Sequence, residues 1–244
     1  IHSLSAKRFL LSLKENATSS PRLFQRATAL QTAYIRDRAA LITYLAGRRH
    51  GKTDALATRM IEHARPGTVQ AYVAPTISRG EEILLPIFRQ LQRDCGLAWD
   101  WNGMHKRITL PNGGAIRIMG MSNEAEVQKL RGEDLFAAYF DECGVPKSKV
   151  LKEGVLSCAW EAMRRYRGMP GSGCTLSGTP GPIPGDPSDP EPDFWWQCTT
   201  QPDAATNRPM YGASRHFGLI YDNPVFRVLE ANGRAKAENS IEED

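Results

Sequence analysis

The chain has 244 residues, which is long enough for one large α/β domain with a small appendage. Its composition, 41% hydrophobic and 24% charged, is ordinary for a globular protein, and its net charge of +4 permits a nucleic-acid partner without requiring one. No apolar stretch approaches the roughly 18–20 residues needed to cross a bilayer, so we expect no membrane partner. The cysteines form no C-x-x-C pair and follow no secretory signal, which indicates reduced, buried thiols: Cys95, Cys143, Cys158, Cys174 and Cys198.

Residues 1–38 are predicted to form an N-terminal helical segment, with helices over 3–13 and 23–38 separated by a turn that ends at Pro21. Gln31 lies on the second helix, shortly before a glycine-flanked loop. A glutamine amide donates and accepts hydrogen bonds at once, so Gln31 is a candidate to contact both edges of adenine. Gln25 is a weaker candidate, and the alternative for both is a solvated position on the helix surface.

The next stretch has the order strand, loop and helix that a phosphate-binding loop requires. An apolar run over 41–45 is followed by the loop 47–51 and by a helical pattern that starts at Lys52. Inward-pointing loop N–H groups and the positive helix N-terminus would hold a polyphosphate, with Lys52 on its β/γ oxygens and the Thr53 hydroxyl on Mg²⁺. The alternative is an ordinary β-turn-α connection, because Ala46 stands where the usual pattern has its first glycine. The candidate nucleotide contacts in this stretch are Gly47, Arg48, Arg49, His50, Gly51, Lys52, Thr53 and Asp54.

Arg48 and Arg49 place two guanidinium groups inside this loop. Such groups could hold γ-phosphate oxygens bidentately while charge develops during phosphoryl transfer. The alternative is a solvated pair beside an anion site.

The middle of the chain continues the alternation of strands and helices. A strand is predicted over 68–74, a helix over 81–95, a hairpin from 106–110 and 115–120, and a loop with a short helix over 122–130. Arg89 and Arg93 lie on one side of the helix expected over 81–95. They are either a solvated helix face or a DNA contact.

A second half-site follows at 135–143. Six apolar residues, which indicate a strand buried on both faces of a parallel sheet, end at Asp141 and Glu142. Carboxylates at the C-terminal end of such a strand face the crevice where α/β sheets bind ligands. Asp141 would hold Mg²⁺, directly or through water, and Glu142 would orient and deprotonate the attacking water. The alternative is an ordinary acidic turn after a strand.

The two half-sites together predict an α/β fold of the P-loop NTPase class, ASCE or RecA-like, with a mainly parallel central sheet flanked by helices. Beyond them we expect a helix over 155–166, a strand over 174–180, a Pro/Gly-rich loop over 181–193 anchored by 194–196, a strand over 214–221 and a helix over 225–237. Small hydroxyl residues at the tip of the strand that ends at Pro180 could sense the γ-phosphate. The domain boundaries predicted on this basis are 1–38, 39–224 for the ATPase core, and 225–244 for a C-terminal helix and tail.

Seven motifs, in this order between Gln31 and Pro224, resemble the ATPase domain of a large terminase subunit, the DNA-packaging motor of tailed bacteriophages and herpesviruses. They are Ala46-Gly-Arg-Arg-His-Gly-Lys-Thr53, Val73-Ala-Pro-Thr76, Pro111-Asn-Gly-Gly114, Leu130-Arg-Gly132, Tyr139-Phe-Asp-Glu-Cys143, Ser177-Gly-Thr-Pro180 and Asp222-Asn-Pro224.

The resemblance implies roles for individual residues. Lys52 and Thr53 would bind phosphate and Mg²⁺, Asp141 would be the Mg²⁺-side carboxylate, and Glu142 the catalytic one. Arg131 would be an arginine finger offered in trans, at gains of about 10³–10⁵ in rate, with Arg48 or Arg49 as rivals in cis. The motif that would couple hydrolysis to movement is Ser177, Gly178, Thr179 and Pro180.

The resemblance also implies partners and limits. The implied partners are double-stranded DNA, a portal protein and a small terminase subunit. The subunits would form a pentameric ring on the capsid, in the host cell cytoplasm during virion assembly, and the isolated chain could remain monomeric. Because no acidic metal cluster follows Asp222, we expect no nuclease activity and interpret the chain as a fragment that lacks a nuclease domain. Weak candidates for DNA contact are Arg89, Arg93, Lys147 and Lys149.

Two other functions stay open at this stage. A helicase-like or recombination motor has the same core, and would unwind strands rather than move intact duplex. A non-hydrolysing nucleotide-binding module or DNA-binding scaffold would use ATP only structurally, although the Asp141–Glu142 pair argues against it.

Overall fold

The computed structural model describes residues 27–47, 50–143, 149–179 and 214–218. The helices expected over 3–13 and 225–237, the turn at 16–21, the loop 181–193 and its anchor at 194–196 lie outside these ranges, as do Gln25, Arg48, Arg49, Lys147 and Pro180. The predicted division into three parts therefore stays a prediction.

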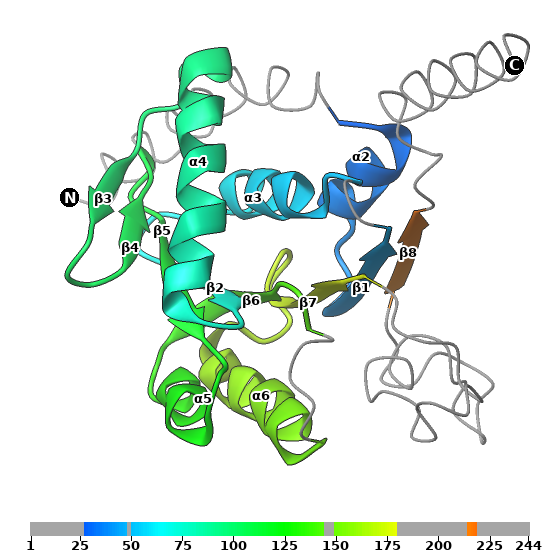
Figure 1. Ribbon diagram of the computed structural model, residues 1–244, viewed down its shortest axis with the longest axis vertical. Coiled ribbons are helices and arrows are strands. Elements are labelled where there is room, and N and C mark those ends of the chain that lie inside the picture. The colour runs from blue at the N-terminus through cyan, green and yellow to red at the C-terminus, as the bar shows by residue number, and fades with distance from the viewer. Residues whose placement is uncertain (1–26, 48–49, 144–148, 180–213, 219–244) are drawn as a thin grey trace, which may run out of the picture.

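The described elements alternate between strands and helices along the chain (Figure 1). In order they are α2 (Ala29–Arg36), β1 (Leu41–Ala46), α3 (Lys52–Glu62), β2 (Val69–Ala74), α4 (Ile77–Cys95), β3 (Asp100–Asn102), β4 (Arg107–Thr109), β5 (Ala115–Gly120), α5 (Glu124–Arg131), β6 (Leu135–Phe140), α6 (Lys149–Ala162), a 3₁₀ turn (Arg164–Tyr166), β7 (Gly173–Gly178) and β8 (Ser214–Gly218).

The strands form one sheet in the order β3-β4-β5-β2-β6-β7-β1-β8, with eight strands among the described residues. The pairs from β5 to β8 are parallel, and the two pairs at the β3–β4–β5 end are antiparallel. Because β7 lies between β1 and β6, the C-terminal ends of these three strands meet at one edge: Leu45 is in register with Gly178, and Phe140 with Leu176. Residues that follow β1 and β6 are thereby brought together.

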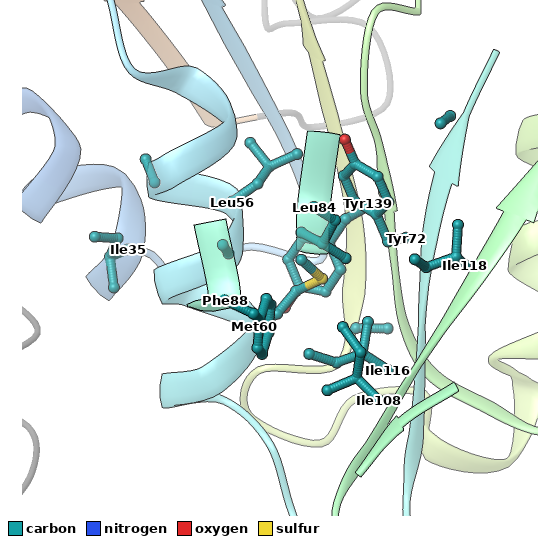
Figure 2. Packing of buried hydrophobic residues seen from close by; sticks show 14 of the residues in the cluster. Ile35, Leu56, Met60, Tyr72, Leu84, Phe88, Ile108, Ile116, Ile118 and Tyr139 are labelled. Carbon is teal, nitrogen blue, oxygen red and sulfur yellow. The ribbon is translucent and has the colours of Figure 1, made fainter. Parts of the chain in front are cut away.

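Helices cover both faces of the sheet, which explains the uninterrupted apolar strands. In Figure 1, α2, α3 and α4 lie on one face and α5 and α6 on the other. Every residue of β1 and of β6 is buried, as expected for strands covered on both sides. Figure 2 shows the core on the α3/α4 face, where Leu56, Met60 and Phe88 pack against the sheet. Full burial of each such side chain contributes about 1.5–3 kcal/mol.

A second apolar cluster fills the other face. Val127 and Leu130 of α5 and Cys158 and Ala159 of α6 pack on the strands there. Cys174 on β7 is free and buried, as expected from the sequence, and burial raises the pKa of its thiol. Within the described ranges, every helix is too short or too polar to traverse a lipid bilayer.

Some element boundaries differ from those predicted. Within the described residues, the helix expected over 23–38 runs from Ala29 to Arg36, and the Thr28 side chain caps its start by accepting a hydrogen bond from the Gln31 N–H. α4 begins at Ile77 rather than 81, capped in the same way by Thr76, and continues through the exposed Pro86. α6 begins at Lys149, earlier than the predicted 155, and the short strand β3 was not predicted.

Candidate active site

The loop after β1 turns into α3 at a glycine. Gly51 has φ +78°, in the left-handed region, and a Cβ placed there would lie 2.7 Å from the Gln31 Nε2 atom. Both conditions favour glycine at this position. α3 then begins at Lys52, so its N-terminal N–H groups and positive dipole end face the space beyond β1, as the phosphate-loop prediction requires.

Lys52 is 7% exposed, and its amine contacts the backbone at the end of β1. Its Nζ donates to the carbonyls of Ala46 at 2.8 Å and Gly47 at 3.0 Å, and reaches the Thr179 Oγ1 at 3.4 Å. Lys52 thus connects the loop with the tip of β7, where the predicted coupling motif begins.

The two predicted half-sites meet at Thr53 and Asp141. The Thr53 hydroxyl donates to the Asp141 Oδ2 at 2.9 Å, and the Tyr72 hydroxyl donates to the same oxygen at 2.7 Å. Asp141 is 2% exposed, so these two donors stabilise a carboxylate that has lost most of its hydration. Tyr72 lies on β2, beside β6.

The donor set suits Mg²⁺, which prefers carboxylate and hydroxyl oxygens and keeps several water or phosphate ligands. The Thr53 hydroxyl and Asp141 carboxylate supply two such oxygens, close enough to share one ion. Across the described residues, no group of three or more His, Cys, Asp or Glu side chains gathers to form a protein-only metal cage. The remaining ligands would come from phosphate oxygens and water.

Glu142 has an unusual backbone conformation directly after Asp141. Its φ is +54°, which a residue with a Cβ rarely adopts, and its N–H donates to the Asp141 Oδ1 at 3.1 Å. The next N–H, of Cys143, donates to the Ser177 carbonyl at 3.1 Å. Strain of this kind is concentrated at functional sites. Here the strained backbone sets the position from which the half-buried Glu142 side chain extends.

Burial raises the pKa of the Tyr72 hydroxyl well above its usual value, and the Asp141 charge raises it further. Tyr72 therefore stays protonated and donates to Asp141 throughout the neutral range. This residue was not predicted from the sequence, because a tyrosine inside a predicted strand is ordinarily core. The only signal that could have found it is a tyrosine hydroxyl near the end of β2, the strand beside β6.

The coupling motif is described over Ser177, Gly178 and Thr179. Ser177 and Gly178 end β7, between the two half-sites. Ser177 is fully buried, and within the described ranges its Oγ has no hydrogen-bond partner. Thr179 faces Lys52, and the Ser177 carbonyl holds the turn after Asp141.

His50 and Gln31 lie behind the loop. His50 is 1% exposed, and its Nδ1 is 3.2 Å from the Tyr44 hydroxyl of β1, which anchors the loop in the core. Gln31 is 8% exposed and contacts the loop backbone through its amide. Asp54, another predicted nucleotide contact, is exposed in the first turn of α3.

Arg131 lies near the N-terminal end of β6, whereas the two half-sites meet at the C-terminal ends of the strands. It is the last residue of α5, before β6, and its half-exposed guanidinium pairs with Glu161 at 2.5 Å. The six residues of β6 separate it from Asp141 by roughly 20 Å. Arg131 therefore cannot reach the site of its own chain, and its role in trans stays a prediction.

The weak candidates for DNA contact are only partly placed. Arg89 and Arg93 are exposed on α4, and Lys149 is the first residue of α6. These positions leave their predicted DNA contact untested.

Comparison with known proteins identifies the family. Residues 43–167, just over half of the 244-residue chain, match the family described as terminase large subunit, T4likevirus-type, N-terminal. No curated protein sequence is significantly similar to the chain. Among solved structures, the chain is similar to the large terminase ATPase domain of Thermus phage P74-26, at 16% identity and a TM-score of 0.58, over 83% of this chain and 84% of that one.

The chain is also similar to the large terminase of a thermophilic bacteriophage in complex with ATP-γ-S, at 16% identity and a TM-score of 0.54. That match covers 81% of this chain and 46% of the other, so the chain spans about half the length of that relative. These likenesses confirm the predicted α/β P-loop fold with a mainly parallel sheet. By its sequence match and its fold, the chain belongs to the terminase large subunit family and corresponds to its T4likevirus-type N-terminal part.

Proposed function

We propose that this chain is a Mg²⁺-dependent ATPase that drives the movement of double-stranded DNA into a viral procapsid. The observation that carries the proposal is the hydrogen bond of 2.9 Å between Thr53 and Asp141, which joins the phosphate loop to the acidic strand end in one site. Membership of the terminase family, and the ATP-γ-S complex of the thermophilic phage relative, support ATP as the nucleotide.

Binding would use the loop between β1 and α3. Backbone N–H groups between Gly47 and Thr53 would bind the β- and γ-phosphates, and the Lys52 amine, which now contacts the Ala46 and Gly47 carbonyls, would bind phosphate oxygens. Thr53 and Asp141 would hold the Mg²⁺ ion, which neutralises the charge that develops on the phosphoryl oxygens.

Hydrolysis would use Glu142 as the general base. It follows the Mg²⁺-side carboxylate directly and lies at the C-terminal edge of the sheet, where the γ-phosphate would end. An arginine would stabilise the transferring phosphoryl group. Arg131 of an adjacent subunit fills that role in our scheme, since it is too far from its own Asp141, and Arg48 and Arg49 are the candidates in cis.

Coupling would pass through the tip of β7. Lys52 reaches Thr179, and the Ser177 carbonyl holds the Cys143 N–H in the turn after Glu142. If a bound phosphate drew Lys52 away from Thr179, or if the γ-phosphate left, contacts on the same strand end would change. We propose that this strand end transmits hydrolysis to the DNA, with the chain acting in a pentameric ring on the portal, together with a small terminase subunit, in the host cell cytoplasm.

Phosphate release from ATP tests the enzymatic core of the proposal. The chain should release phosphate with Mg²⁺ present and stop when EDTA is added, and Lys52→Ala should bind ATP weakly. Turnover that persists without a divalent ion, or ATP affinity unchanged by Lys52→Ala, would reject the proposed site. A strand-unwinding assay separates a packaging motor, which moves intact duplex, from a helicase.

A further inference from the structure

The side-chain amide of Gln31 makes hydrogen bonds with three backbone groups. Its Nε2 donates to the carbonyls of His50 at 3.2 Å and Gly51 at 3.1 Å, and its Oε1 accepts from the Thr28 N–H at 2.8 Å. An amide nitrogen has two hydrogens, so both are used. Reading adenine would require Gln31 to break contacts that the protein itself supplies.

These partners allow only one orientation of the amide. A flipped group would place Oε1 against two carbonyl oxygens and its NH₂ against the Thr28 N–H. Both contacts would be repulsive. The hydrogen-bond partners therefore fix which end of the Gln31 amide is the oxygen and which is the nitrogen, although the two ends have similar shapes.

The two carbonyls lie where the loop becomes a helix. Gly51 O also accepts the first hydrogen bond of α3, from the Ala55 N–H at 3.1 Å. A carbonyl held on the outside of a tight loop directs the neighbouring N–H groups inward, toward a bound anion. Gln31 thus fixes the backbone orientation that a phosphate site needs.

The helix that carries Gln31 is itself fixed to α3. Arg59, 3% exposed on α3, donates through Nη1 to the Tyr34 carbonyl at 2.8 Å and the Ile35 carbonyl at 2.9 Å, at the C-terminal end of α2. In the last turn of the helix few carbonyls have a partner within the helix, and here the Tyr34 carbonyl also accepts the Asp37 N–H at 3.2 Å, while the Ile35 carbonyl also contacts the His63 Nε2 at 3.0 Å. Because Arg59 of α3 binds the C-terminal end of α2, and α2 packs on α3, the helix that carries Gln31 is held in place.

We propose that Gln31 is a positioning residue of the phosphate loop and does not select the base. The proposal rests on the proposed function, since it requires that residues 47–53 bind a polyphosphate. Loss of the amide should then weaken every ligand that uses the loop, whatever base it carries.

Titration calorimetry with three Mg²⁺-bound probes, ATP, GTP and inorganic tripolyphosphate, tests this. Gln31→Ala removes two hydrogen bonds to the loop, so its dissociation constants should rise about tenfold for all three probes alike. A base-contacting glutamine would instead weaken ATP and leave tripolyphosphate unchanged, and that result would overturn the proposal, as would unchanged affinity for all three.

Two further variants separate the loop contact from helix capping. Gln31→Glu keeps the Oε acceptor of the capping box and loses the donor, so it should fold and bind all three probes weakly even if Gln31→Ala does not fold. Thr28→Val removes the cap hydroxyl and keeps the amide contact, so it should lower the melting temperature and leave the three affinities unchanged. If the unmodified chain binds none of the probes, the proposed function fails and this role fails with it, whereas a base-selective loss rejects only the role of Gln31.

Discussion

The Thr53 hydroxyl and the Asp141 carboxylate, 88 residues apart in the sequence, share a hydrogen bond of 2.9 Å. The contact exists because β7 is inserted between β1 and β6 and aligns the C-terminal ends of all three strands. One ion that bridges nucleotide phosphates can therefore be held by residues from both half-sites.

Asp141→Asn should abolish Mg²⁺-dependent turnover. The change replaces one carboxylate oxygen by an NH₂ group, which cannot bind a cation and repels the donors around it. We expect phosphate release to fall by about 10²-fold or more. Asp134→Asn is the matched control, because Asp134 is an exposed carboxylate before β6 that pairs with Arg165 at 2.6 Å. Equal losses in the two variants would contradict a specific role for Asp141.

Tyr72→Phe should raise the Mg²⁺ concentration needed for half-maximal turnover. The variant keeps the buried ring and removes only the hydroxyl that donates to the Asp141 Oδ2. Hydrogen bonds to charged groups contribute about 1.5–3 kcal/mol, so a rise of about tenfold or more is expected, with ATP affinity in EDTA unchanged. Tyr166→Phe is the control, because Tyr166 packs on Phe136 near the other end of β6. An unchanged Mg²⁺ requirement in Tyr72→Phe would show that the Tyr72 hydroxyl does not help to orient the carboxylate.

Glu142→Gly should stabilise the fold while it abolishes hydrolysis. A non-glycine residue at φ +54° is strained, and glycine relieves about 1 kcal/mol of that strain. Turnover should fall by about 10²–10⁴-fold with the loss of the general base. Glu142→Gln should lose turnover in the same way without the gain in melting temperature.

Lys106→Gly provides the comparison for Glu142→Gly. Lys106 also has a positive φ, +52°, but belongs to the β3–β4 connection. Its partly exposed ion pair with Glu81 contributes little, so glycine should raise the melting temperature there too and leave turnover intact. Full turnover in Glu142→Gly would exclude Glu142 as the base.

His63 should make the fold less stable in acid. Burial, followed by the nearby Arg59 and Arg38 charges, lowers the pKa of His63 to about 3. In the unfolded chain the pKa lies near 6.5, so between about pH 6.5 and 3 the unfolded state binds the extra proton. The unfolding free energy should thus be highest above pH 6.5 and fall with pH by about 1 kcal/mol per unit from this group.

Chemical denaturation between pH 7 and pH 4 measures this effect. His63→Gln keeps a donor for the Ile35 carbonyl, which lies 3.0 Å from the His63 Nε2, and removes the titration. The variant should show a shallower fall than the unmodified chain. Parallel pH profiles would mean that His63 does not titrate differently on unfolding.

Arg131 should act only between subunits. Arg131→Ala and Glu142→Gln should each be nearly inactive, while a mixture should regain turnover, because an intact Glu142 of one chain then meets an intact Arg131 of the next. Arg165→Ala, at an exposed arginine of the same sheet edge, should stay active. A mixture as inactive as its components would reject the trans arrangement.

Much of the fold was predictable from local patterns. The apolar runs at 41–45 and 135–140 correspond to β1 and β6, and the Pro111–Gly114 turn joins β4 to β5. β3 was missed because it has only three residues, of which Asp100 and Asn102 are polar and exposed, so the single apolar residue between them is too little to mark an alternating pattern. α4 was predicted to start late because Gly80 weakens the helical pattern. Gly80 instead allows a close approach of Ile118.

The site was predictable as motifs but not as contacts. Each half-site has a local signature, whereas the Tyr72 hydroxyl reaches Asp141 from a neighbouring strand, which no spacing in the sequence encodes. Gln31 was identified by its position upstream of the loop. Its partners, the backbone carbonyls of His50 and Gly51, depend on how α2 packs against α3.

The most direct test of a single shared site is a double-mutant cycle on MgATP binding with Thr53→Ala, Asp141→Asn and the double variant. Side chains that hold the same ion should be coupled, so the double variant should bind with a free-energy loss at least about 1 kcal/mol smaller than the sum of the single losses, and the coupling should vanish in EDTA. Additive losses that are the same with and without Mg²⁺ would contradict the shared site on which this account depends.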